Sequence, residues 1–106
     1  MARKKTLEFA ESALGDLEDI RDWYTEQQVP EVGKPLVSQI VLPVERLVDF
    51  PETGRVVPEF GLTNLRELIQ PPFRIVYRLH TVRILIIRVW RSERLLKVPD
   101  RVESGT

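Results

Sequence analysis

The chain has 106 residues, a formal net charge of zero, no cysteine and one histidine. This length suits a single domain that buries roughly two thirds of its unfolded surface without metals or disulfides. The lack of cysteine excludes thiol chemistry, cysteine zinc sites and a disulfide framework, and one histidine cannot form a histidine-rich metal site. We therefore expect no metal and no cofactor. No signal peptide or membrane span is recognisable, so we expect one cytoplasmic domain over residues 1–106, with a core at about 6–96 and a tail at 97–106.

Charge is distributed unevenly along the chain. Residues 1–60 contain 7 Lys and Arg against 12 Asp and Glu, a net charge of −5, whereas residues 61–106 contain 9 against 4, a net charge of +5. The zero total argues against a general nucleic-acid binder. The asymmetry nevertheless predicts one face suited to a polyanion or an acidic peptide.

The first half predicts a short strand and a helix. In "KTLEFAES", apolar Leu7 and Phe9 alternate with polar residues, as in a strand. Ser12 is expected to cap a helix that runs to about Gln28. The apolar face of this helix comprises Leu14, Leu17, Ile20 and Tyr24.

A second helix should begin near Pro30 and bend at Pro43, which removes one backbone hydrogen bond. "FPETGR" (50–55) ends it, with Gly54 expected in the left-handed region. Its apolar stripe comprises Val37, Ile40, Val41, Val44, Leu47 and Val48.

Residues 65–69, 73–79 and 82–89 predict three further strands, the last two joined by a two-residue loop at His80–Thr81. The order is β-α-α-β-β-β. We expect an α+β domain in which a helical hairpin packs on one face of a small antiparallel sheet.

Seven arginines and only two acids lie in residues 65–94, the most apolar part of the chain. The two-residue loop would place Arg78 opposite Arg83, a destabilising pair of like charges. One hairpin face is then continuously apolar and is assigned to the core, and it comprises Phe73, Ile75, Tyr77, Leu79, Val82, Ile84 and Ile86. The other face mixes arginines with aliphatic residues, namely Arg74, Val76, Arg78, Arg83, Leu85, Ile87, Val89 and Arg91. An apolar strip with a rim of one charge predicts a docking surface; the alternative is that residues 95–106 cover it.

The segments "ALGDLEDIRDWY", "FPETGR-VVPEF", "LRELIQPPFRIVYRL" and "VRILIIRVWRSERLL", in this order and spacing, resemble the RelE/ParE superfamily of toxins from type II toxin–antitoxin (plasmid stabilisation) systems. The likeness covers about residues 6–96 and is closer to the ParE branch. It implies an antitoxin whose C-terminal segment wraps the toxin, and an acidic amphipathic segment would suit the mixed face. It also implies one of two activities: cleavage of mRNA on the ribosome in the RelE branch, or poisoning of DNA gyrase by some members of the ParE branch.

The resemblance assigns the nuclease residues only in part. Arg74 matches a functional arginine of the nuclease branch, and Arg94 matches a later one. Ser92 replaces a key arginine, and the expected C-terminal tyrosine falls near Val98. The lysines expected on the strand "RELI" are replaced by an arginine and Glu67.

RNA cleavage through the 2′-oxygen also needs a general base. Arginine cannot serve as one, because its guanidinium group stays protonated and cannot accept a proton. Histidine is the usual general base near neutral pH, but His80 is expected at a solvated hairpin tip without a carboxylate. Glu67 and Glu93 are expected to pair with arginines. If the chain were a nuclease, its catalytic candidates would be Arg74, Arg91, Arg94 and His80.

These residues favour a ParE-like toxin that is not an enzyme and inhibits a macromolecular target, with DNA gyrase as a candidate. The alternatives are a RelE-type endoribonuclease and a non-toxic homologue that binds antitoxin. Trp90 can anchor a partner or pack in the core, since buried Trp and Arg dominate binding hot spots. The predicted antitoxin or target surface comprises Arg74, Val76, Arg78, Arg83, Leu85, Ile87, Val89, Trp90, Arg91 and Arg94.

Overall fold

The computed structural model describes residues 4–91 and contains two helices and a mixed sheet of five strands. The elements in chain order are β1 (Thr6–Phe9), α1 (Glu11–Glu26), α2 (Pro30–Glu45), the 3-10 turn η1 (Arg46–Val48), β2 (Arg55–Val56), β3 (Leu65–Gln70), β4 (Phe73–Leu79) and β5 (Arg83–Arg91). The strand order is β1-β5-β4-β3-β2, with β1 parallel to β5 and the other pairs antiparallel. The predicted α+β class is confirmed. The short β2 and the parallel pairing of β1 were not predicted.

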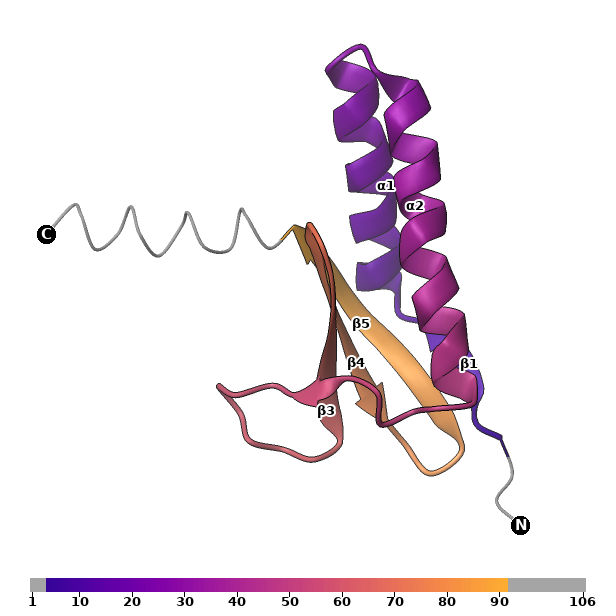
Figure 1. Cartoon of the computed structure of the whole chain (residues 1–106), viewed down its shortest axis with the longest axis vertical. Coiled ribbons are helices and arrows are strands. Elements are labelled where there is room, and N and C mark those ends of the chain that lie inside the picture. The colour runs from indigo at the N-terminus through magenta and orange to yellow at the C-terminus, as the bar shows by residue number, and fades with distance from the viewer. Residues whose placement is uncertain (1–3, 92–106) are drawn as a thin grey trace, which may run out of the picture.

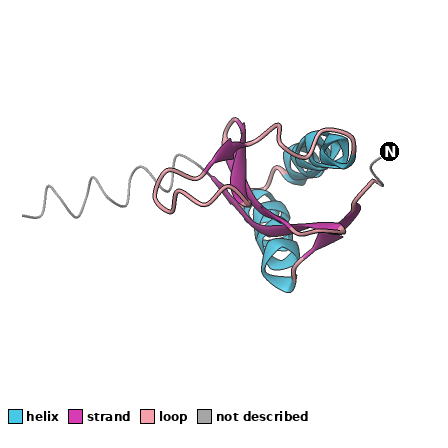
Figure 2. Ribbon diagram, turned by 90° about the horizontal axis from the view of Figure 1, so that it is seen from below, coloured by secondary structure: helices cyan, strands magenta, loops and turns pink. Residues whose placement is uncertain are grey.

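The helical hairpin packs on one face of the sheet, and its turn projects away from the strands (Figure 1). Figure 2 looks nearly along the helices and shows the twist of the sheet. Both helices contribute to the main core, which consists of Ala13, Ile20, Ile40, Val44, Leu47, Phe73, Ile75, Tyr77, Ile84, Ile86 and Val89. No helix in the described part of the chain is long and apolar enough to cross a membrane.

The register of α1 differs from the prediction at its first turn. Leu14 is 48% exposed, whereas Ala13 is fully buried. The buried stripe therefore runs through Ala13, Leu17 and Ile20, a helical spacing that the large side chain of Leu14 obscures in the sequence. A small residue at position 13 lets α1 approach the sheet closely.

The helix ends also depart from the expected signals. Ala10 occupies the N-cap of α1 without any side-chain hydrogen bond, so the predicted cap by Ser12 is wrong. Pro30 begins α2, as predicted, because a first-turn residue needs no backbone donor. Pro43 lies inside α2, which continues only to Glu45 before the backbone tightens into η1.

A β-bulge in β5 sets the faces of the central hairpin. Tyr77 pairs with Ile86, but the next residue of β4, Val76, pairs with Arg88, so Ile87 is an extra residue on β5. An extra residue reverses the alternation of side chains beyond it. The loop also spans residues 80–82, and Arg78 pairs with Leu85. The predicted opposition of Arg78 and Arg83 is therefore wrong.

The bulge moves two residues of the predicted mixed face to the helix side. Val89 is 2% exposed within the main core, and Arg91 donates a hydrogen bond of 2.8 Å from Nη1 to the hydroxyl of Tyr24 on α1. Both were expected on the opposite face. No local pattern indicates the extra residue, because "RILIIRVW" is apolar at several successive positions.

Helix α1 holds the bulge through two side chains. The hydroxyl of Ser12 donates to the carbonyl of Ile87 at 2.6 Å. Asp16 accepts hydrogen bonds from the backbone N–H of Val89 (2.8 Å) and from both Nε and Nη2 of Arg88 (2.8 and 3.0 Å). These bonds supply partners to backbone groups beyond Phe9, where β1 has ended.

We predict that Asp16→Ala lowers the free energy of unfolding by about 2–3 kcal/mol, because it leaves the Val89 N–H unpaired next to the core. Glu8→Ala is the matched control. It removes an acid that pairs with Arg83 at 3.0 Å between side chains 41% and 48% exposed, and should change stability by less than about 1 kcal/mol. Urea unfolding of the three proteins measures both effects. Equal losses in the two variants would contradict the role of Asp16.

Candidate functional site

The sheet face turned away from the helices, here called the outer face, carries most of the predicted binding residues. Cross-strand pairing places them in rows: Ile69, Arg74 and Trp90; then Arg55, Glu67, Val76 and Arg88; then Leu65, Arg78, Leu85 and Glu8; and last Arg83 and Thr6. Arg74, Val76, Arg78, Arg83, Leu85 and Trp90 thus share a face, as predicted for the first five.

The apolar strip on this face is covered in part by the protein itself. Val57, Leu65 and Val76 form a second buried cluster, against which Ile87 and Trp90 pack. The cover comes from the segment after β2 and from β3. The alternative that residues 95–106 cover the strip falls outside the described residues, as do Arg94 and Glu93.

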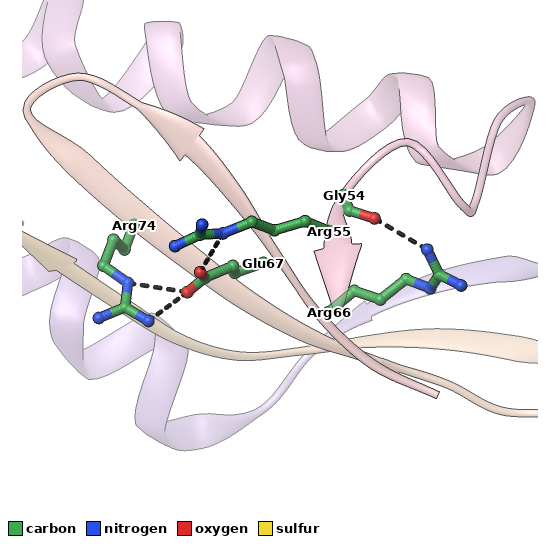
Figure 3. Close-up of polar contacts among 5 residues, drawn as sticks. All are labelled: Gly54, Arg55, Arg66, Glu67 and Arg74. Carbon is green, nitrogen blue, oxygen red and sulfur yellow. Dashed lines mark hydrogen bonds and ion pairs between the residues drawn. The ribbon is translucent and has the colours of Figure 1, made fainter. Parts of the chain in front are cut away.

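A buried carboxylate links three strands at the centre of the outer face (Figure 3). Glu67 is 1% exposed and accepts a hydrogen bond of 2.6 Å at Oε2 from Arg55 Nε. Its other oxygen, Oε1, accepts Nε of Arg74 at 2.8 Å and also Nη2 of the same side chain. The expectation that Glu67 pairs with arginines is confirmed. Because the Glu67 carboxylate is buried, loss of both arginines would leave it as an uncompensated charge.

A turn before β2 positions Arg55. The N–H of Gly54 donates to the hydroxyl of Tyr77 at 2.9 Å, and that hydroxyl donates to the carbonyl of Pro51 at 2.8 Å. The carbonyl of Gly54 accepts Nη1 of Arg66 at 2.9 Å, as Figure 3 shows. Gly54 does not have positive φ, contrary to the prediction. A Cβ there would lie 2.6 Å from the Tyr77 hydroxyl, so the position requires glycine for lack of space.

Most arginines near the outer face have acidic partners. Arg83 pairs with Glu8, and Arg88 pairs with Asp16 at the edge of the sheet. The hydrogen bonds to Asp16 raise the pKa of the Arg88 guanidinium, which lies 4.9 Å from the centre of the Trp90 ring. Arg78 has neither an ion pair nor a hydrogen bond among residues 4–91. The low number of acids in residues 65–94 therefore leaves Arg78 without a partner in the described part of the chain, whereas Arg74 and Arg83 each have one.

On the helix side, the end of β5 meets an aromatic pair of α1. The guanidinium of Arg91 lies 5.1 Å from the ring centre of Trp23 and 5.8 Å from that of Tyr24. The two rings meet edge to face at 4.8 Å. Trp23 is 45% exposed, so it seals the helical hairpin less completely than Tyr24. Nearby, Leu14, Leu17, Glu18, Arg21, Lys34 and Val37 line an open groove between α1 and α2.

The described nuclease candidates lie apart. Arg74 is on the outer face, Arg91 is on the helix side, and His80 follows the far end of β4. His80 follows Arg74 by six positions, which corresponds to about 20 Å along an extended strand at roughly 3.3 Å per residue. His80 is partly buried, not solvated as predicted, and its Nε2 has no hydrogen-bond partner in the described part of the chain. No group of three or more His, Asp or Glu side chains there could hold a metal.

Sequence reasoning identified the arginines but missed three of their acidic or positioning partners: Asp16, Glu8 and Tyr77. Glu67 lies on the same face of β3 as apolar Leu65, and this spacing of two indicates a buried position. The partners from β1 and α1 carry no such signal, because they lie more than 70 residues from their arginines.

Comparison with known proteins places this geometry in a family. Residues 7–96 match the family model described as ParE toxin of type II toxin–antitoxin system, parDE. A chain of the chromosomal ParDE system from P. aeruginosa is 28% identical, with a TM-score of 0.71 over 83% of this chain and 96% of the other. The fold is shared with chains of the RelBE2 complex from Mycobacterium tuberculosis (18% identity, TM-score 0.56, 84% and 99% covered) and of the E. coli DinJ-YafQ complex (9%, 0.58, 88% and 98%). No match was found among curated proteins.

Tyr77→Phe should remove both hydrogen bonds to the turn and lower the free energy of unfolding by about 1–3 kcal/mol at neutral pH. Burial raises the pKa of Tyr77 above its ordinary 10.0, although the Gly54 N–H and Arg66 partly offset this. The neutral phenol thus contributes stability that is present below pH 10 and is lost as the pH rises above it. The stability difference between wild type and Tyr77→Phe should therefore shrink above pH 10 in urea unfolding. A difference that grows with pH would contradict this assignment.

Proposed function

Because the chain belongs to the ParE family of toxins from type II toxin–antitoxin systems, we propose that it is a cytoplasmic growth inhibitor that acts by binding a macromolecular target, with DNA gyrase as the leading candidate, and that a cognate antitoxin neutralises it. The main support against RNA cleavage is the state of Arg74. Its side chain is 19% exposed and is paired with the buried Glu67.

An arginine in this state is poorly suited to phosphate chemistry. A catalytic arginine must direct its donors at the charge that develops on the phosphate oxygens, and the donors of Arg74 that are paired with Glu67 cannot do so without breaking that pair. A general base must also lie within hydrogen-bond reach of the proton that it removes. The only histidine lies about 20 Å away along β4, as strand geometry requires. These features favour inhibition by binding over cleavage.

We propose the outer face as the surface that takes the antitoxin's C-terminal segment. Arg78 is a cation without a partner in the described chain, and it lies next to the partly exposed Leu85. Trp90 and Ile87 continue the apolar surface toward Arg88. An acidic amphipathic segment would pair its acids with Arg78 and cover Leu85, Ile87 and Trp90 with its apolar side. The similarity to a chain of the chromosomal ParDE toxin–antitoxin system of P. aeruginosa supports such a partner.

Induced expression without antitoxin tests the proposed activity. We expect filamentation, DNA damage and inhibition of DNA supercoiling by purified gyrase, and no mRNA cleavage at the ribosomal A site. Ribosome-dependent mRNA cuts by the purified protein would contradict the proposal and favour the RelE-type alternative. Normal growth at a verified level of folded protein would favour a non-toxic homologue.

Leu85→Asp should weaken antitoxin binding by about 2 kcal/mol or more, because it removes buried apolar area and adds a like charge next to an acidic ligand. Val82→Asp is the matched control, since Val82 is 67% exposed at the hairpin loop and should leave the affinity within about 0.5 kcal/mol of wild type. Calorimetric titration of each folded variant with the antitoxin tail measures both. Equal affinities would place the docking surface elsewhere, with the groove between α1 and α2 as the next candidate.

A further inference from the structure

The arrangement of arginines around Glu67 has the form of an anion site that is already filled. Arg55 and Arg74 come from the strands on either side of β3 and direct their guanidinium groups at one carboxylate. The two oxygens of this carboxylate accept the hydrogen bonds that both arginines donate. Arg74 directs two donors at Oε1 and Arg55 directs one at Oε2, and charge-assisted hydrogen bonds of this kind are how arginines bind carboxylates and phosphates. In this protein the anion is supplied by the chain itself, and its side chain is fully buried.

This arrangement determines the charge balance of the cluster formed by Arg55, Glu67 and Arg74. Arg55 and Arg74 carry two positive charges, and Glu67 removes one of them. The side chain of Arg55 is 61% exposed and uses only Nε, so its outer donors face solvent. Without the carboxylate, two guanidinium groups with free donors would lie side by side on a face that also carries Arg78. Such a cluster attracts phosphate groups strongly.

We propose that Glu67 is a specificity-determining residue, an internal anion that occupies Arg55 and Arg74 and so prevents the outer face from binding phosphodiester chains. The face keeps Arg78 as a cation without an acidic partner among residues 4–91, and thereby remains selective for a protein partner with few, well-placed acids. This inference concerns what the surface rejects and does not depend on which target the toxin inhibits.

Glu67→Gln tests the inference directly, because glutamine keeps the size of the side chain and removes its charge. We expect the affinity for a fluorescein-labelled oligouridylate, measured by fluorescence anisotropy at about 50 mM salt, to rise roughly tenfold. This is the gain from about one added phosphate contact on a single strand, and it should steepen the dependence of log K on log salt by about 0.7. Glu8→Gln is the matched control, with the same change in net charge on the same face.

The control should gain less than about threefold, because the Arg83–Glu8 pair is solvated and Arg83 is already accessible to anions. Equal gains in the two variants would mean that net charge alone acts and would overturn the proposal. No gain in folded Glu67→Gln would overturn it as well. Circular dichroism and thermal unfolding establish that each variant is folded.

A second pair of variants keeps the test valid if Glu67→Gln does not fold. Arg55→Gln and Arg78→Gln each remove one positive charge from exposed or partly exposed positions of the outer face. At a salt concentration low enough for wild-type binding to be measured, Arg78→Gln should weaken oligouridylate binding severalfold. Arg55→Gln should weaken it less than twofold, since Glu67 already occupies that arginine. Equal losses, or a larger loss in Arg55→Gln, would overturn the proposal.

Discussion

The bulge at Ile87 determines which residues of this domain reach solvent and which reach the core. Its position depends on hydrogen bonds from α1, where Ser12 binds the Ile87 carbonyl and Asp16 binds the Val89 N–H. Because side chains alternate along a strand, one extra residue reverses every later assignment on β5. Val89 therefore completes the core and Arg91 turns to α1, while Trp90 takes a place on the outer face. The first helix thus sets the composition of a surface on the opposite side of the sheet.

The same constraint explains how a face rich in arginine is compatible with a stable sheet. The acids that pair with Arg83, Arg88 and Arg74 come from β1, α1 and β3, and each faces its arginine only because the strands are in this register. A shift by one residue would turn the two strand acids, Glu8 and Glu67, toward the apolar core, where an unpaired charge is costly. Two acids of the negative first half, Glu8 and Asp16, are thus matched to arginines of the positive second half.

Local patterns predicted most of the fold, because the strands and both helices carry clear alternation or helical spacing. β4 was predicted to the residue, and Glu67 was expected to pair with arginines. The patterns failed where the deciding contact is remote in sequence. Nothing near Ile87 announces a bulge, since the stabilising side chains lie about 70 residues earlier. Leu14 and Ala13 were misassigned because the closest approach of α1 to the sheet favours the smaller residue over the more apolar one. Gly54 was expected to have positive φ, which is wrong; the constraint on this position is the nearby Tyr77 hydroxyl, which no local pattern indicates.

The position of Glu67 connects folding to function in one residue. A buried ion pair contributes little net stability compared with apolar residues of similar volume, because desolvation offsets the attraction. The role that we propose for Glu67 at the centre of the outer face therefore lies in what it does to the neighbouring arginines. With the carboxylate in place, Arg74 is held in the sheet and Arg55 presents its outer donors, while Arg78 lies beside Leu85 without an acidic partner in the described part of the chain. An amphipathic peptide gains both from such a cation and from the aliphatic surface beside it, whereas a phosphodiester polymer requires several cations in a row. The outer face can therefore discriminate between the two.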